Sequence, residues 1–480
     1  MNLSIIGFVI YLVALIAIGM ISARSSSTGV GAYFLANRSL NKYVVAISAV
    51  ASGRSAWLLL GFVGIAYAKG IAAIWAALGY IVVECLLFFF YAPKLRKLTE
   101  ENDDITIPDF YVSQLGDRSG LLRGLLVLVI AVFMVAYVSA QFVAGGKAFF
   151  GSFGIEQTTG VFLTAAIILI YTTLGGFMAV SKTDIVQAFF MLLALVVLPI
   201  VAVINFGGWT PIVETVVQAD KMFFDLEAVS WGVMIGYLGI GLGAPGNPHI
   251  LVRYMSIDKP EDLRSAAIMG TFWNVVLALG AISIGFAARA YFPEVSTLPS
   301  GDAEQAFPFL ASQLLNPLLF GFIIAAIFSA IMSSADSQLL VAASAIVRDF
   351  YQKLILKDSE IDSRTLVFIS RCVVAVLVLL ALFFGLFASD LVFWLVLFAW
   401  GGLGATIGST SLLTLFWKGS TRAGVIAGII TGGVLIFLWK LVPFFKENIW
   451  NIYELIPAFL GSFVITILVS LMTNSVESDS

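Results

Sequence analysis

Ala51-Ser-Gly-Arg-Ser-Ala-Trp57 places an arginine in the middle of an apolar stretch, Tyr43 to Gly70, in which the next charge is Lys69. A charge at membrane depth costs from about 2.5 to more than about 10 kcal/mol, so a chain keeps one where it is paired or faces a polar cavity. The small residues around Arg54 are poor helix formers, and we therefore expect the helix to open there. Broken helices at membrane depth are where secondary transporters bind their cargo.

The composition is that of a helical membrane protein with many spans. Of the 480 residues, 60% are hydrophobic and 11% are charged, with a mean hydropathy of +1.02, whereas soluble domains carry about 25% charged residues. The apolar runs are continuous instead of alternating, which excludes a barrel. A net charge of −3 without a basic tract gives no indication of nucleic-acid binding. One histidine and two cysteines argue against an enzyme, a metal centre or a bound cofactor.

Apolar runs of about 20 residues predict thirteen spans in one transmembrane domain covering residues 1–480. No segment between them is long enough to fold alone. The first run lacks a basic flank and a cleavage site, so we interpret it as a retained span. The spans are expected near 4–22, 43–68, 71–91, 124–149, 157–180, 184–206, 229–247, 265–289, 314–346, 365–388, 391–416, 421–440 and 453–473.

The lysines and arginines between the spans predict the orientation. The loops after the odd-numbered spans carry nineteen of them and the alternate loops carry six, with Arg54 inside the membrane. Positive charges gather on the cytoplasmic side. We therefore expect a plasma (inner) membrane protein with its N-terminus outside and its C-terminus in the cytoplasm.

A second interrupted helix is predicted five spans after the first. Span 7 reads Gly236-Tyr-Leu-Gly-Ile-Gly-Leu-Gly-Ala-Pro-Gly-Asn-Pro248, and its prolines and glycines should break it near its inner end. Two interrupted helices at matching places predict an inverted repeat, with one copy at about 43–206 and the other at about 229–416. Spans 4–22, 421–440 and 453–473 would be peripheral. The alternative is that the glycines serve tight helix packing.

Five motifs, taken in order, resemble the sodium/solute symporter family, and most closely its bacterial sodium/proline branch. They are Tyr33-Phe-Leu-Ala-Asn-Arg-Ser-Leu40, Ile107-Pro-Asp-Phe110, Gly175-Gly-Phe-Met-Ala-Val-Ser-Lys-Thr-Asp-Ile-Val-Gln187, Asn247-Pro-His-Ile250 and Met332-Ser-Ser-Ala-Asp-Ser-Gln-Leu-Leu340. The likeness covers nearly the whole chain. It implies a LeuT-like fold with five-plus-five inverted repeats and transport by alternating access.

The resemblance also implies a sodium ion between spans 2 and 9. Ala51, Arg54 and Ala330 occupy positions that supply backbone carbonyls, and Ser333 and Ser334 occupy positions that supply hydroxyls. The spacing of Ala330, Ser333, Ser334 and Ser337 independently places them on one helix face. The alternative is a face of small residues that serves packing.

Arg54 departs from the family pattern and raises a rival interpretation. The proline branch has an aspartate where this chain has Gly53, an apolar residue at position 54, and aromatic residues where this chain has Ile240 and Ala244. Two positive charges about 4 Å apart repel by about 4 kcal/mol at an effective dielectric of 20. A guanidinium inside the ion site would thus replace sodium and yield a sodium-independent carrier or exchanger.

Three acidic residues are candidate partners for Arg54 or members of the ion path: Glu84, Asp184 and Asp336. The sequence does not choose among them. Asp184 follows Ser181 by three residues, the spacing of a capping box, so capping of a helix start is the plain alternative for it.

Six residues are candidates for the substrate site: Ser55, Ala56, Trp57, Tyr137, Gln141 and Ala244. Amides exposed at a helix break can hold a carboxylate, and the aromatic residues offer apolar faces with polar tips. A small zwitterionic or carboxylated solute fits this chemistry. Interfacial packing is the alternative for the two aromatic side chains.

The leading hypothesis is therefore a sodium symporter that imports a small organic solute, such as the amino acid proline. A sensor built on the same fold, binding without transport, is the alternative from another class. The sequence leaves the solute, the stoichiometry and the oligomeric state open.

Overall fold

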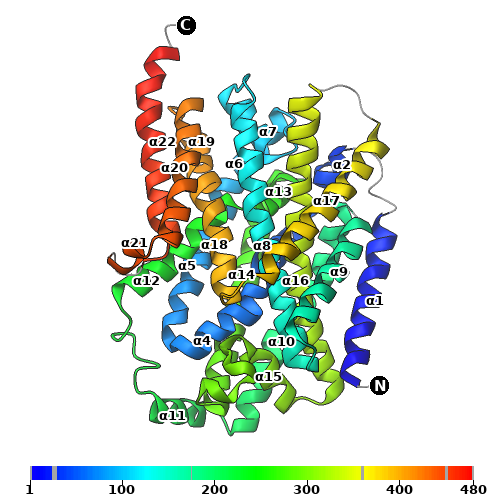
Figure 1. Cartoon of the computed structure of the whole chain (residues 1–480), viewed down its shortest axis with the longest axis vertical. Helices are drawn as coiled ribbons and strands as arrows, with labels where there is room; N and C mark the ends of the chain where they lie inside the picture. The colour runs from blue at the N-terminus through cyan, green and yellow to red at the C-terminus, as the bar shows by residue number, and fades with distance from the viewer. Residues whose placement is uncertain (1–2, 24–29, 175, 358–361, 449–451, 478–480) are drawn as a thin grey trace.

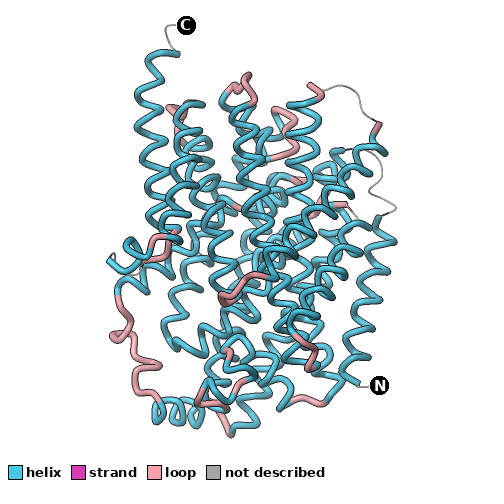
Figure 2. Tube along the Cα trace, in the orientation of Figure 1, coloured by secondary structure: helices cyan, strands magenta, loops and turns pink. Residues whose placement is uncertain are grey.

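The computed structural model describes residues 3–23, 30–174, 176–357, 362–448 and 452–477, which are almost entirely helical (Figures 1 and 2). These residues form no strand, and their one β-bridge joins Leu40 to Ile257. The helices of the first half are α1 (Leu3–Ala23), α2 (Val30–Leu35), α3 (Lys42–Ala56), α4 (Val63–Lys69), α5 (Ala73–Leu86), α6 (Ala92–Glu101), α7 (Ile107–Leu115), α8 (Leu121–Phe153), α9 (Gln157–Leu174), α10 (Phe177–Phe206) and α11 (Trp209–Ala219).

The second half is also helical. Its helices are α12 (Trp231–Leu238), α13 (Pro248–Met255), α14 (Leu263–Tyr291), α15 (Ala306–Leu314), α16 (Pro317–Ser344), α17 (Ser363–Leu386), α18 (Val392–Leu403), α19 (Ser409–Phe416), α20 (Arg422–Leu441), α21 (Pro443–Asn448) and α22 (Leu455–Glu477). Short 3-10 or π-type segments are η1 (Ala36–Arg38), η2 (Trp57–Phe62), η3 (Gly70–Ala72), η4 (Leu87–Tyr91), η5 (Gly239–Gly246), η6 (Pro260–Asp262), η7 (Val295–Thr297), η8 (Pro299–Gly301), η9 (Ala303–Gln305), η10 (Ala345–Ile355) and η11 (Gly404–Gly408).

Ten helical stretches of the described chain are long and apolar enough to cross a membrane. One of them, Lys42–Glu101, is 60 residues long and covers the predicted spans 43–68 and 71–91. Predicted spans 157–180 and 229–247 coincide with shorter or interrupted helices. The predicted count of thirteen therefore stays a prediction. The described ends of the chain lie at opposite poles of the molecule (Figure 1), as an odd number of crossings requires.

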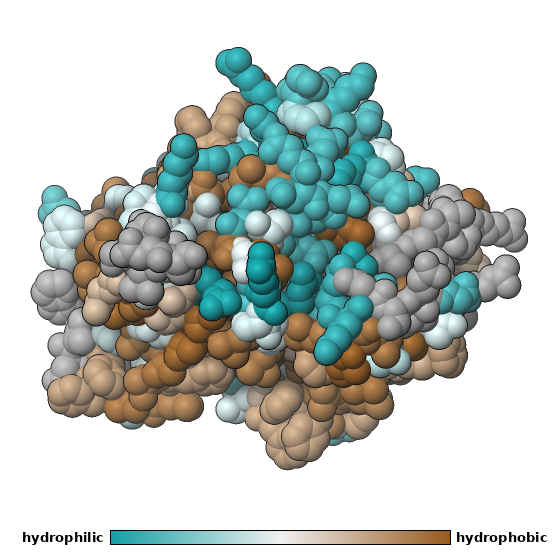
Figure 3. All heavy atoms as spheres, turned by 90° about the horizontal axis from the view of Figure 1, so that it is seen from above, coloured by the Kyte–Doolittle hydropathy of each residue, from teal (hydrophilic) through white to brown (hydrophobic). Residues whose placement is uncertain are grey.

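The pole near the C-terminus carries the polar surface expected at a membrane face. Hydrophilic side chains gather over the middle and upper part of this face, and apolar side chains lie along its lower rim (Figure 3). Apolar residues along the flanks, among them Phe368, Leu379 and Phe383, are more than half exposed. Such side chains suit contact with lipid.

The predicted opening of span 2 is present at Ser55. Its φ of 46° and ψ of −172° lie outside the helical region, and the chain continues through the wider turn η2 into α4. A non-glycine residue with positive φ is uncommon and is held by its surroundings. All residues from Val44 to Ala56 except Ile47 are buried, so the break lies inside the protein.

The second predicted break is also present, but it lies in the middle of its span and not at the inner end. Between α12 and α13 the chain forms the 3-10 segment η5, which contains the glycines and Pro245. A new helix then starts at Pro248 and runs to Met255. The predicted end of span 7 at residue 247 was wrong because a proline in the first helical turn favours a helix start.

The glycines of η5 also serve close packing, so both interpretations of this run hold. A Cβ on Gly241 would lie 2.2 Å from the Gly79 carbonyl oxygen, and one on Gly79 would lie 2.3 Å from the Leu238 carbonyl oxygen. The backbone of α5 therefore rests directly on the backbone of the interrupted span. This contact brings Tyr80 and Glu84 of α5 beside the breaks.

The junction between spans 5 and 6 differs from the prediction. Helix α9 ends at Leu174 and α10 begins at Phe177, with Gly176 at its N-cap. Asp184 thus lies two turns inside α10, and capping of a helix start was the wrong interpretation of it. The Ser181 side chain makes no hydrogen bond among the described residues.

Candidate functional site

The break in α3 leaves backbone groups that α16 and α8 satisfy. The Ala56 N–H, which would donate to Ser52 in an unbroken helix, donates to Gln141 Oε1 at 3.1 Å. The freed Ser52 carbonyl accepts from the Ser334 hydroxyl at 2.8 Å. The Trp57 N–H donates to Ser55 Oγ at 3.1 Å. The local unwinding is therefore stabilised by side chains from two other helices.

Four of the predicted sodium ligands lie together between α3 and α16. The Ser333 hydroxyl lies 3.3 Å from both the Ala51 and the Ala330 carbonyl oxygens, and Ser334 is one residue further on. All four residues are buried. A cluster of carbonyl and hydroxyl oxygens is the chemistry a hard cation prefers, so the residues present fit a sodium ion.

Gly53 and the Arg54 side chain stand apart from that cluster. A Cβ on Gly53 would meet Ile250 Cδ1 at 3.2 Å. The Arg54 carbonyl accepts from the Trp57 N–H. The Arg54 guanidinium contacts α5: it pairs with Glu84 and lies 4.1 Å from the centre of the Tyr80 ring. The partner of Arg54 is therefore Glu84, one of the three acidic residues among which the sequence did not choose.

Asp184 belongs to a different buried ion pair, one that the sequence did not predict. Its Oδ2 accepts from Arg253 Nη2 at 2.8 Å, from Ser48 Oγ at 2.6 Å and from Ser52 Oγ at 3.2 Å. Arg253 also donates to Ser337 Oγ at 2.7 Å and to Ser48 Oγ at 2.6 Å. The sequence placed Arg253 in a loop because span 7 was expected to end before it. The sequence did offer one signal for a buried Arg253: it follows the apolar run that begins at Pro248.

Asp336 lies beside this network on α16. It is fully buried, and its Oδ1 accepts from Ser337 Oγ at 3.2 Å. Its Oδ2 and the Asp184 Oδ1 have no hydrogen-bond partner among the described residues. Two carboxylate oxygens are therefore left open near the Ser333–Ser337 turn.

A small cavity lies where the two interrupted spans meet. Its volume is about 10 Å³, counted as the space open to the centre of a water molecule, which is room for about one water. Every lining residue is buried. Trp400 Nε1 donates to the Ile240 carbonyl of η5 at 2.8 Å and closes one wall. The lining residues are Gly53, Arg54, Trp57, Tyr80, Tyr137, Ile240, Val396, Leu397 and Trp400.

The predicted substrate residues divide into three groups around this cavity. Trp57 and Tyr137 line it, whereas Ala244 is buried outside the lining. Ser55 and Ala56 form the opened turn next to it, and Gln141 of α8 accepts from the Ala56 N–H. Tyr80, Val396, Leu397 and Trp400 were missed because nothing in their local sequence marks them as facing a cavity.

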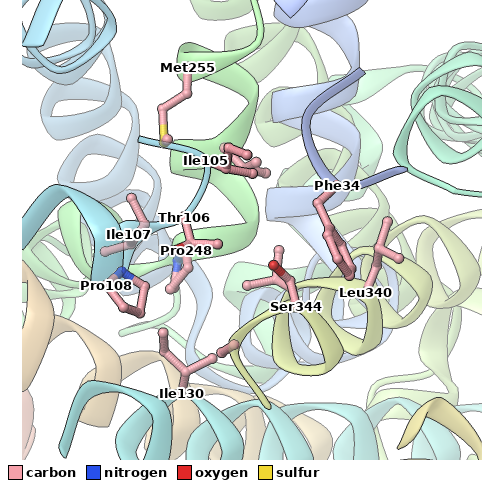
Figure 4. A pocket seen from close by; sticks show the side chains of 13 residues that line it. Phe34, Ile105, Thr106, Ile107, Pro108, Ile130, Pro248, Met255, Leu340 and Ser344 are labelled. Atoms are coloured by element: carbon pink, nitrogen blue, oxygen red, sulfur yellow. The ribbon is translucent and has the colours of Figure 1, made fainter. Parts of the chain in front are cut away.

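A second small cavity lies between α13 and the end of α16, toward the C-terminal pole (Figure 4). Phe34, Ile105 and Pro108 approach it from three other segments. Most of the side chains that line it are apolar. Arg38 fastens the segments, since it donates to the carbonyls of Met255 at 3.0 Å and of Asp104 and Thr99 at 2.7 Å each.

The Asp104 carboxyl in this region has an altered acidity. Its pKa is raised to about 6, chiefly by burial and in smaller part by the neighbouring Asp109, while the hydrogen bond from Ser113, whose hydroxyl lies 2.7 Å from Asp104 Oδ2, opposes the rise. Part of the carboxyl population is therefore protonated near neutral pH.

Ion pairs join α8 to η9 and the residue before it at the opposite pole. Lys147 of α8 contacts Glu304 Oε2 at 2.6 Å and Asp302 Oδ2 at 2.7 Å. Glu304 also accepts the first backbone amides of α18, Val392 N at 3.0 Å and Phe393 N at 2.9 Å. A carboxylate at a helix N-terminus is stabilised by the helix dipole. Burial raises the pKa of Glu304, while Lys147 opposes that shift.

Two membrane helices that are interrupted beside one shared buried cavity define a secondary transporter. The comparisons with known proteins agree. A model of the sodium:solute symporter family matches residues 33–432, and the chain belongs to that family. The predicted resemblance is confirmed.

Individual relatives support the same assignment. Sodium/proline symporters of Staphylococcus aureus strains NCTC 8325 / PS 47 and COL are 36% identical over 480 residues, covering 98% of this chain and 93% of each relative. A substrate-bound, outward-open Na⁺-coupled sialic acid symporter shares 21% identity at a TM-score of 0.81, with 98% of both chains covered. MhsT in complex with L-phenylalanine shares 11% identity at a TM-score of 0.59, with 90% of this chain and 99% of that chain covered. The predicted all-α, LeuT-like membrane fold is confirmed.

Proposed function

We propose that the protein imports a small amino acid, with proline as the first candidate, in symport with sodium. The observation that carries this proposal is the pairing of the broken α3 with the hydroxyl face of α16. Oxygens of Ala51, Ala330, Ser333 and Ser334 would coordinate the ion, with the Arg54 carbonyl as a further ligand once its bond to Trp57 is released. Relatives named sodium/proline symporters support the choice of solute.

The contacts of Arg54 argue against the sodium-independent alternative. The guanidinium pairs with Glu84 on α5 and does not reach the Ser333–Ser334 oxygens in any described contact. The repulsion of about 4 kcal/mol that a cation 4 Å away would exert on sodium therefore does not apply. Gly53 supplies no carboxylate to the site, so we expect weaker sodium binding than in relatives with an aspartate there.

Asp184 and Asp336 would form the ion's path toward the C-terminal pole. Both are buried on the side of the sodium cluster that Arg253 occupies, and each has one carboxylate oxygen without a partner among the described residues. In the predicted orientation this pole faces the cytoplasm of a cell bounded by its plasma membrane. The inverted repeats would comprise residues 43–206 and 229–416.

Uptake into proteoliposomes tests the coupling. With an inward sodium gradient and an inside-negative potential, radiolabelled L-proline should accumulate. The potential contributes about 2.3 kcal/mol per charge per 100 mV. Replacing sodium by potassium should reduce the initial rate at least about tenfold. Undiminished uptake in potassium contradicts sodium coupling, and binding without accumulation would favour the sensor interpretation.

A further inference from the structure

Arg54 lines the central cavity, and its buried partner Glu84 lies on α5 outside the lining. The Arg54 and Glu84 side chains are 2% and 5% exposed. Glu84 is held from the other side by Asn274 Nδ2, 2.8 Å from Oε2. Removing one partner of a buried pair leaves an uncompensated charge and is strongly destabilising. Each of the two charges must therefore keep a partner for the protein to stay stable.

Polar atoms near the pair lack hydrogen bonds. Arg54 Nε, Trp57 Nε1 and Gln141 Nε2 are buried donors without an acceptor among the described residues, and Asn274 Oδ1 is a buried acceptor without a donor. Buried polar groups are normally satisfied, and an unsatisfied one calls for a bound group or a water. Donors predominate on the Arg54 side, and the open acceptor lies on the residue that holds Glu84.

We propose that Arg54 and Glu84 form the substrate's charge clamp, in which Arg54 takes its carboxylate and Glu84 takes its ammonium group. This inference rests on the proposed function, amino-acid import. Between substrates the two side chains pair with each other. When a zwitterion binds, two ion pairs replace this one: Arg54 pairs with the substrate carboxylate and Glu84 with the substrate ammonium group. Neither protein charge is then left without a partner.

The same electrostatics select the substrate class. A ligand with a carboxylate but no amine would pair with Arg54 and leave Glu84 buried and unpaired. A ligand with an amine but no carboxylate would pair with Glu84 and leave Arg54 buried and unpaired. Either arrangement leaves a lone charge inside the protein. Dipolar amino acids of zero net charge are therefore favoured over monoanions and monocations of the same shape. The rings of Trp57, Tyr137 and Trp400 and the Ile240 side chain line the cavity beside Arg54, and a compact apolar body would pack against them once the cavity widens.

Competition against labelled L-proline tests each half of the clamp. The competitors are L-prolinamide, which lacks the carboxylate, and cyclopentanecarboxylate, which lacks the amine. In the wild-type protein, each should compete at least about 100-fold more weakly than L-proline, the loss of about 2.7 kcal/mol expected for one charged contact. Arg54→Gln should abolish the discrimination against prolinamide, and Glu84→Gln should abolish that against cyclopentanecarboxylate.

The double variant Arg54→Met/Glu84→Met removes both charges together and avoids a lone buried charge. It should bind L-proline at least about tenfold more weakly, with all three ligands competing about equally. Lys440→Met, which removes a charge from the exposed Lys440–Asp390 pair, is the control and should discriminate as the wild type does. Thermal unfolding of each variant in detergent shows whether it is folded.

The outcomes separate this inference from the proposed function. A wild-type protein that accumulates none of the natural amino acids under a sodium gradient contradicts both. A wild-type protein that accumulates proline, together with a folded double variant that still rejects both analogues, contradicts only the clamp. In that case the Arg54–Glu84 pair has a structural role and does not bind substrate.

Discussion

Arg253 Nη2 lies 2.8 Å from Asp184 Oδ2, and neither side chain is exposed to any extent. The pair links the second half of interrupted span 7 to α10, and Ser48 of α3 contacts both partners. The movements of these three helices are therefore coupled through one buried salt bridge.

Loss of this bridge should destabilise the protein severely. Arg253→Met leaves Asp184 charged and buried, and breaking such a pair costs about 3–5 kcal/mol. Thermal unfolding in detergent should show a clear fall in Tm. The matched control is Lys97→Met, because the Lys97 and Glu101 side chains are 72% and 53% exposed in their 3.8 Å contact and exposed pairs contribute about 0–1 kcal/mol. Equal losses in the two variants would contradict the coupling role.

The hydroxyls facing the break in α3 should set the sodium affinity. Ser334→Ala and Ser333→Ala each remove one oxygen from the proposed ion site, so the sodium concentration for half-maximal uptake should rise about tenfold, or about 1.4 kcal/mol. Ser329→Ala is the control on the same helix, because the Ser329 hydroxyl is hydrogen-bonded to the Tyr11 hydroxyl and to the Ala325 carbonyl. A rise as large in Ser329→Ala as in the other two would place the ion elsewhere.

The close contact between α5 and η5 should not tolerate a methyl group. Gly241→Ala would push a Cβ to 2.2 Å from the Gly79 carbonyl oxygen, and overpacking of this kind costs about 1–3 kcal/mol or more. Gly433→Ala has only an ordinary contact at 3.7 Å with Thr406 and should leave Tm and proline uptake unchanged. Normal uptake and stability in Gly241→Ala would contradict the packing described for the breaks.

The raised pKa of Asp104 predicts a pH dependence of stability. The folded carboxyl has a pKa of about 6 against an ordinary 3.8, so the folded state binds more protons than the unfolded state between these values. Stability should therefore fall as pH rises from about 4 to about 6 and stay lower above it, by no more than about 3 kcal/mol. Asp104→Asn should raise Tm at pH 7.5 and flatten the dependence of Tm on pH.

The exposed Asp103→Asn is the control for that measurement. It should leave both Tm and its pH dependence as in the wild type. An Asp104→Asn protein with a lower Tm at pH 7.5 would show that the charged carboxylate stabilises the fold.

The sequence predicted those features that depend on local chemistry. The opening at Ser55 follows from the small residues around Arg54, and the gathering of Ala51 with Ser333 and Ser334 follows from helical spacing together with the family likeness. The restart of the helix at Pro248 was missed, although the same residue type that ends a helix also begins one.

Pairings across helices could not be predicted. Glu84, Asp184 and Asp336 were equal candidates for Arg54 because the choice depends on how α5 rests on η5, and that contact depends on glycines whose partners lie far away in the chain. The role of Arg253 was hidden by the same error at Pro248, which moved it from the protein interior to a loop.

Glu304 makes two sets of contacts at the N-terminal pole, one with Lys147 and one with the start of α18, and so links the movements of both. One carboxylate holds Lys147 and the first amides of the helix that carries Trp400, so neither contact can be released without disturbing the other. Separation of Lys147 from Glu304 and movement of Trp400 away from the cavity should therefore occur in one concerted step. Probes at these two places should report the same relaxation rate.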